Sequence, residues 1–93
     1  MRKEKRTEQD VLMEAVENGI SVTEEYRHEG YDTILLTRQS DGEELKMMRK
    51  VPGRVWTLKG DCVPKWLKLS DYKAQYLKAM ELAISILMQF KRP

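Results

Sequence analysis

The sequence is poor in the side chains that most often carry chemistry. It contains one cysteine, Cys62, and one histidine, His28, so a single chain can form neither an internal disulfide bond nor a zinc site of the Cys/His type. We expect His28 to be a solvated turn residue and Cys62 to be a small buried hydrophobic residue. Two lysines close to Cys62 in sequence leave a reactive thiolate as the alternative. These observations predict a protein that is not an enzyme and that uses no metal and no cofactor.

Glycine and proline are also scarce. The 93 residues include five glycines and three prolines, and a predicted turn or helix end accounts for each glycine. The sequence therefore indicates neither a flexible linker nor a glycine-rich phosphate-binding loop. A chain of this length has room for one hydrophobic core. We expect a single domain over residues 1–93, in which residues 1–6 form a disordered basic tail.

Long apolar runs are absent as well. The most apolar stretch, residues 82–90, is interrupted by Ser85 and Gln89 and is far shorter than the ~20 residues of a membrane-spanning helix. The first ten residues are charged throughout and show no apolar core of a secretory signal. We expect a cytoplasmic protein without a membrane partner, and the sequence indicates no small-molecule substrate.

Two stretches show helical patterns. Thr7 as N-cap, apolar residues at helical spacing and a stop at Gly19 predict a first helix over residues 8–18. Ser70 is a second candidate N-cap, and it precedes a long helical pattern over residues 71–90.

Between the helices the sequence alternates with a period of two, which is typical of half-buried strands. Turn residues such as Asp41-Gly42 divide it into strands over residues 20–27, 31–38, 43–50 and 54–59. Pro64 makes residues 62–69 an edge strand or an extended connection. The fold class is therefore α+β, with an N-terminal helix, an antiparallel β-meander of three to five strands and a long C-terminal helix packed on the sheet.

The C-terminal helix is apolar around most of its circumference. Its apolar arc spans about 240°, whereas a one-sided surface helix needs roughly 100°. Leu77, Ile84 and Met88 lie beyond the face that would cover the sheet. One interpretation is a homodimer with these three residues in its interface. The alternative is that the first helix and the sheet together cover the additional face.

Charge is distributed unevenly along the chain. Residues 1–45 contain 6 Lys/Arg and 12 Asp/Glu, a balance of −6, whereas residues 46–93 contain 11 and 3, a balance of +8. The basic, aromatic segment 46–68 is the candidate nucleic-acid site, because cations can track phosphates and aromatic rings can stack on bases. Its candidate residues are Lys46, Arg49, Lys50, Arg54, Trp56, Lys59, Lys65, Trp66 and Lys68. The alternative places both tryptophans in the core and the lysines on a solvated face.

Two architectures are similar to the predicted element order. Helix, three strands, helix resembles the double-stranded-RNA-binding domain, which implies a first helix that faces RNA and a lysine cluster at the start of the last helix. Here the first helix carries four carboxylates, and the last begins with Ser70 and Asp71. A basic antiparallel sheet followed by one long dimerising helix resembles a class of single-stranded-DNA-binding proteins, and it matches the charge distribution better.

The sequence thus predicts a small binding module for single-stranded or duplex nucleic acid. The alternative is a protein–protein interaction module, such as a phage or mobile-element regulator, inhibitor or adaptor. Such a module would act through the flank of helix 71–90 or through a charged face. No sequence motif identifies a partner in either case.

Overall fold

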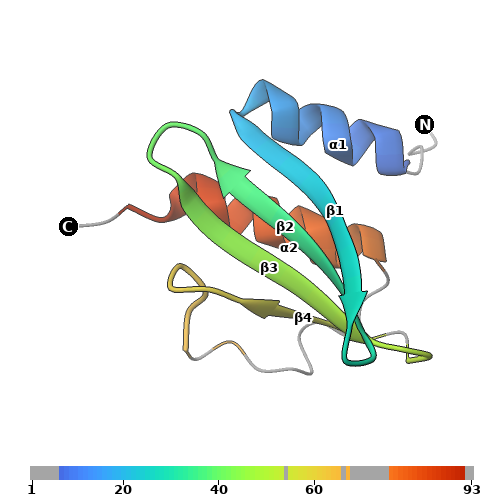
Figure 1. Ribbon diagram of the computed structural model, residues 1–93. Coiled ribbons are helices and arrows are strands. Elements are labelled where there is room, and N and C mark those ends of the chain that lie inside the picture. The colour runs from blue at the N-terminus through green and yellow to red at the C-terminus, as the bar shows by residue number, and fades with distance from the viewer. Residues whose placement is uncertain (1–6, 54, 66, 68–75, 92–93) are drawn as a thin grey trace.

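The computed structural model describes residues 7–53, 55–65, 67 and 76–91. The tail predicted over residues 1–6 and the predicted N-cap Ser70 lie outside these residues. The described chain has the order α1, β1, β2, β3, β4, α2 (Figure 1). The predicted α+β fold is therefore confirmed, with four strands in the meander.

Helix α1 (Glu8–Glu17) begins at a capping box. The Thr7 Oγ1 atom accepts a hydrogen bond from the backbone N–H of Asp10 at 3.2 Å, and Asp10 Oδ2 accepts one from the backbone N–H of Thr7 at 3.0 Å. The helix ends at Asn18, and Gly19 follows with φ of 73°, which glycine adopts without steric cost. The predicted bounds of this helix are confirmed to within one residue.

The four strands form one antiparallel sheet in the order β1-β2-β3-β4. Their bounds are Ile20–His28 for β1, Tyr31–Arg38 for β2, Glu43–Lys50 for β3 and Trp56–Lys59 for β4. The last strand is shorter than predicted, and the described residues between Cys62 and Leu67 form turns and irregular chain rather than a strand. His28 ends β1, opposite Tyr31 in β2, and its side chain is outside the described part of the structure.

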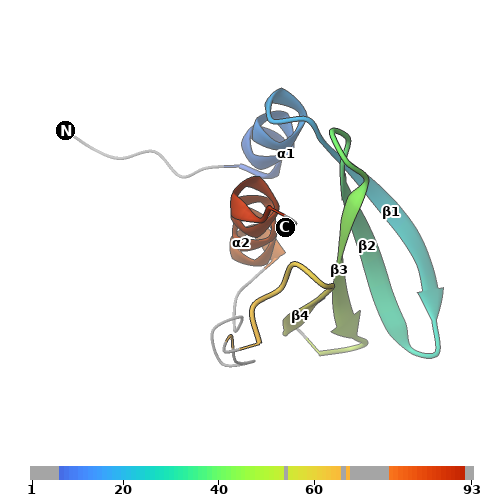
Figure 2. The same cartoon turned by 90° about the vertical axis from the view of Figure 1, so that its left-hand side faces the viewer.

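Both helices lie on the same side of the sheet, and no other described element covers the opposite side (Figure 2). Helix α2 (Tyr76–Gln89) contacts β2, β3, β4 and α1, and α1 contacts β1. Period-two alternation directs every second strand residue into this layer. In β2, Ile34 and Leu36 are buried there, whereas Leu35 belongs to the opposite face. The remaining buried strand residues on the helix side are the apolar Ile20, Leu45, Met47, Trp56 and Leu58 and the carboxylate Glu43, which is 5% exposed.

Arg38 joins the end of β2 to the end of α2. Its Nη1 atom donates to the carbonyl oxygens of Leu87 and Phe90, which lie where the last turn of a helix leaves its carbonyls without partners. The same guanidinium holds Asp41 through Nε at 2.9 Å and Nη2 at 2.5 Å. This contact is the main reason that the pKa of Asp41 falls to about 2, from its usual 3.8.

The wide apolar arc of α2 is used largely within the chain. Ile84 is 2% exposed, and Leu77 packs against the core as a partly buried residue. Of the three residues expected in a dimer interface, only Met88 is strongly exposed, at 45%. The sheet and α1 therefore account for most of the additional apolar face.

Candidate nucleic-acid interface

The uncovered side of the sheet is a polar surface that contains several of the predicted cations. We define the open face as the side chains that alternate away from the helices. They are Ser21 and Thr23 in β1, Tyr31, Thr33, Leu35 and Thr37 in β2, Glu44, Lys46, Met48 and Lys50 in β3, and Thr57 and Lys59 in β4. Threonine is the most frequent residue of this face. Hydroxyl groups and cations are both able to donate hydrogen bonds to an anion.

Three lysines on the open face are placed by the strand register. Lys46 in β3 lies directly opposite Lys59 in β4, and Lys50 lies four residues further along β3 on the same face. At ~3.4 Å per residue, Lys50 is about 14 Å from Lys46. Among the described residues, none of the three lysines has an ion-pair partner. Like charges directly opposite each other destabilise a sheet, so a bound anion would relieve the Lys46–Lys59 pair.

An aromatic residue stands beside the third lysine. Tyr31 is the register partner of Lys50, and its side chain is partly exposed. Tyr31 was not among the predicted site residues because it lies outside the basic segment 46–68 in sequence and reaches that segment only through strand pairing. The turn at Asp41-Gly42 is the sequence feature from which Tyr31 could have been predicted. This turn fixes the register of β2 and β3, in which Tyr31 lies opposite Lys50.

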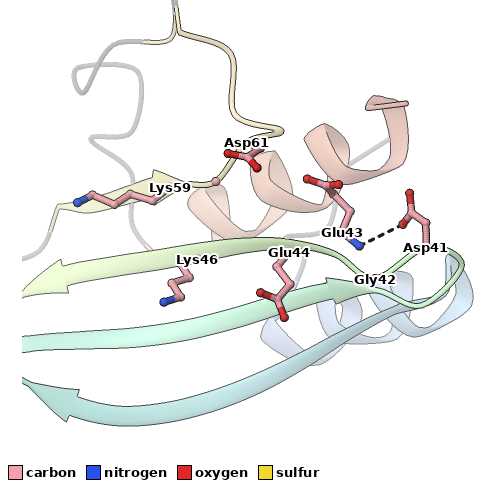
Figure 3. A pocket seen from close by; sticks show the side chains of 8 residues that line it. Asp41, Gly42, Glu43, Glu44, Lys46, Lys59 and Asp61 are labelled. Atoms are coloured by element: carbon pink, nitrogen blue, oxygen red, sulfur yellow. Dashed lines mark hydrogen bonds between the residues drawn. The ribbon is translucent and has the colours of Figure 1, made fainter. Parts of the chain in front are cut away.

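The opposite end of the open face is acidic. A cavity of about 580 Å³ lies where β3 extends beyond β4, and Figure 3 shows Glu44 and Lys46 on one side of β3 and Glu43 on the other. The cavity is lined by Asp41, Gly42, Glu43, Glu44, Lys46, Lys59, Gly60 and Asp61. Of these carboxylates, Glu44 is the one on the open face, whereas Glu43 is 5% exposed on the other side of β3 and Asp41 is bound by Arg38. Glu44 is therefore the charge at this end that repels a polyanion on the open face. The favourable path across the sheet therefore leads from the Lys46–Lys59 pair towards Lys50 and Tyr31.

The chain after β4 passes close to β3 at this acidic end. A Cβ atom on Gly60 would lie 2.9 Å from the carbonyl oxygen of Glu44, so glycine is required for the approach. Cys62 follows, with its Sγ atom 3.7 Å from the same oxygen, and it is 4% exposed. Burial raises the pKa of the Cys62 thiol. Its surroundings thus match the predicted buried hydrophobic residue and not a reactive thiolate.

Arg49 and Trp56 lie on the helix side of the sheet. The Arg49 guanidinium carbon is 5.3 Å from the centroid of the Trp56 ring, and Arg49 Nη2 also donates to Asp32. Trp56 is 6% exposed and packs against Tyr76 of α2 at 5.6 Å between ring centroids. Trp56 is therefore a core residue, as the alternative interpretation of the sequence proposed. Arg49 is fixed in place by its contacts with Trp56 and Asp32.

The other predicted site residues are separate from the open face or outside the described chain. Lys65 is exposed in the irregular segment that follows Cys62. Arg54, Trp66 and Lys68 lie outside the described residues. Within the described ranges, no group of three or more His, Cys, Asp or Glu side chains is placed to hold a metal ion.

Comparison with known proteins gives this site no precedent. No protein-family model, no curated protein and no solved structure matches the chain. In the part of the chain that the structure describes, no helix has the length and apolar character that crossing a membrane requires. Any functional inference must therefore come from the geometry of the chain itself.

Proposed function

We propose that the protein binds single-stranded nucleic acid across the open face of its sheet. The observation that carries this proposal is the set of Lys46, Lys50 and Lys59, three exposed cations on the open face for which the described residues provide no ion-pair partner. Cations in such an arrangement can neutralise successive phosphates and release condensed counterions, which is the dominant source of affinity for nucleic acids.

Tyr31 and the neighbouring apolar side chains favour a single strand over a duplex. A base in a single strand exposes its ring for stacking, and Tyr31 offers an aromatic surface beside Lys50. Leu35 and Met48 add partly buried apolar surface near the centre of the face. Thr57 is held beside them, since its hydroxyl donates to the Met48 carbonyl oxygen at 3.2 Å.

Binding of duplex RNA through the first helix has less support. Helix α1 carries Glu8, Asp10, Glu14 and Glu17 and has no lysine or arginine between residues 8 and 17. Such a helix repels phosphates. The sheet and not α1 is therefore the proposed contact surface.

The proposal is tested by fluorescence anisotropy with labelled single-stranded DNA, single-stranded RNA, duplex DNA and duplex RNA over a series of salt concentrations. We expect the single strands to bind best. With three phosphates neutralised at ~0.7 each, the slope of log K against log[salt] should be about −2. A preference for duplex, or no binding to any probe at low salt, would exclude this function.

The structure gives less support to a homodimer through α2 than the sequence did. Ile84 and Leu77 are used within the chain, which leaves Met88 alone of the three expected contact residues. The alternative function, a protein-interaction module, is supported by another surface, the exposed apolar side of α1.

A further inference from the structure

Helix α1 carries apolar side chains on its outer side as well as on its inner side. Val11 and Ala15 face the core and are 0% exposed, whereas Met13 and Val16 are 55% and 72% exposed. Leu12 lies between these two groups and is partly buried. We call Leu12, Met13 and Val16 the outer stripe. Four large apolar side chains of the described residues are strongly exposed, and α1 is the one element that has two of them close together.

Exposed carboxylates lie at both edges of the outer stripe. Glu8 is four residues before Leu12 and Glu17 is four residues after Met13, and residues 8–17 contain no lysine or arginine. Glu17 is exposed in the last turn, where the helix dipole disfavours a negative charge, and no ion pair to it occurs among the described residues. An apolar strip with acidic edges is complementary to a strip of the same width with basic edges.

We propose that the outer stripe of α1 is a docking surface for a basic amphipathic helix of a protein partner. Met13 and Val16 are three residues apart, and Leu12 and Val16 are four apart, so the stripe presents the ridge that a partner helix packs against. Lysine and arginine side chains at the edges of the partner helix would form ion pairs with Glu8 and Glu17. The stripe lies on α1, in the helix layer, and the open face is on the other side of the sheet (Figure 2). The two surfaces can therefore be occupied together.

A second copy of this chain fits the outer stripe poorly. Packing the outer stripe against the same stripe of another copy would bring Glu8 and Glu17 of the two helices close together, and residues 8–17 contain no lysine or arginine to pair with them. The acidic character of this surface thus selects a partner of opposite charge and argues against self-association.

The experiment uses the full chain and a labelled designed peptide of about 18 residues, long enough to form a helix, with leucine on one face and lysine on the other. Anisotropy should show saturable binding. The double substitution Met13→Gln/Val16→Gln should weaken it by about tenfold or more, because it removes the apolar contact without adding charge. A peptide with the same residues in scrambled order should bind much more weakly.

Two matched charge changes separate docking from general attraction between acid and base. Glu17→Lys places a cation at the edge of the stripe and should weaken peptide binding by about threefold to tenfold. Glu44→Lys makes the same change of charge on the open face and should leave peptide binding unchanged. The altered side chains are exposed, so thermal unfolding should show that each variant is folded.

Two results would overturn the inference. The first is equal binding of the peptide by the wild type and by Met13→Gln/Val16→Gln, which would make the attraction purely electrostatic. The second is a dimer in light scattering that the same double substitution converts to a monomer, which would assign the stripe to a second copy. Anisotropy with single-stranded DNA on the same variants reports on the open face separately, so failure of either proposal can be recognised by itself.

Discussion

The sheet carries cations on both of its faces, and the contacts of these cations differ between the two faces. On the helix side, Arg49 is fixed by the Asp32 carboxylate and lies 5.3 Å from the centroid of the Trp56 ring. On the open face, Lys46 and Lys59 stand directly opposite each other, and no carboxylate of the described residues pairs with them. A cation that stabilises the fold has a partner within the chain, whereas a cation without one is available to bind something else.

The largest effect should come from a substitution on the helix side of the sheet, and it should be a loss of stability. Trp56→Ala should lower the free energy of unfolding by about 3–5 kcal/mol, because it leaves a large void beneath α2. That is a substantial part of the roughly 5–15 kcal/mol of a typical domain. Urea unfolding followed by circular dichroism measures the loss.

The adjacent residue gives a control for this substitution. Val55 is 42% exposed, so Val55→Ala should change the free energy of unfolding by no more than about 0.5 kcal/mol. If Trp56→Ala kept full stability and lost only nucleic-acid binding, the assignment of Trp56 to the core would be wrong.

The next effect concerns the open face and should change binding without changing stability. Lys46→Gln/Lys59→Gln should lower the affinity for a single-stranded oligonucleotide by about tenfold, since exposed ion pairs contribute up to about 1 kcal/mol each. The salt slope should become shallower by about 1.4. Removal of a like-charge pair should leave the free energy of unfolding equal or slightly higher.

Lys78 on α2 provides the matched lysine control. It is exposed, and α2 lies on the other side of the sheet from the proposed contact surface (Figure 2). Lys78→Gln should therefore leave both the affinity and the salt slope unchanged. An equal loss of affinity in this variant would mean that overall charge, and not the open face, determines binding.

The contrast between these faces also shows what could be predicted from the sequence. The order of elements followed from local signals, such as Thr7 as an N-cap and Asp41-Gly42 as a turn, and the capping box of α1 and the positive φ of Gly42 agree with them. The assignment of side chains to faces did not, because Ile34, Leu35 and Leu36 are apolar in succession and pairing across strands decides which one turns away. The candidate site depended on that assignment, so it combined Lys46 and Lys59 with Trp56 of the opposite face.

Acid should lower the free energy of unfolding by protonating the carboxylates that are paired with arginines on the helix side of the sheet. The Arg38 contact lowers the pKa of Asp41 to about 2, and hydrogen bonds from Arg27 and Arg49 lower that of Asp32. In the unfolded chain both groups regain a pKa near 3.8, so their contribution is complete above that pH. It is lost as the pH falls through the lowered pKa of each group, which for Asp41 is about 2. The free energy of unfolding should decrease over this window, and the decrease should be smaller in Arg38→Gln. An identical pH dependence in the two proteins would show that the Arg38–Asp41 pair does not contribute.

The smallest effect should come from the acidic end of the open face. Glu44 is exposed two residues before Lys46 on the same side of β3, and it lines the acidic cavity (Figure 3). Glu44→Lys replaces a repulsive charge with an attractive one, so the affinity for a single strand should increase by roughly threefold to tenfold, and the salt slope should become steeper by about 0.7. Anisotropy at several salt concentrations measures both quantities. An increase in affinity without a steeper slope would mean that the new lysine contacts no phosphate, and the path of the nucleic acid would then begin beyond Glu44, at the Lys46–Lys59 pair.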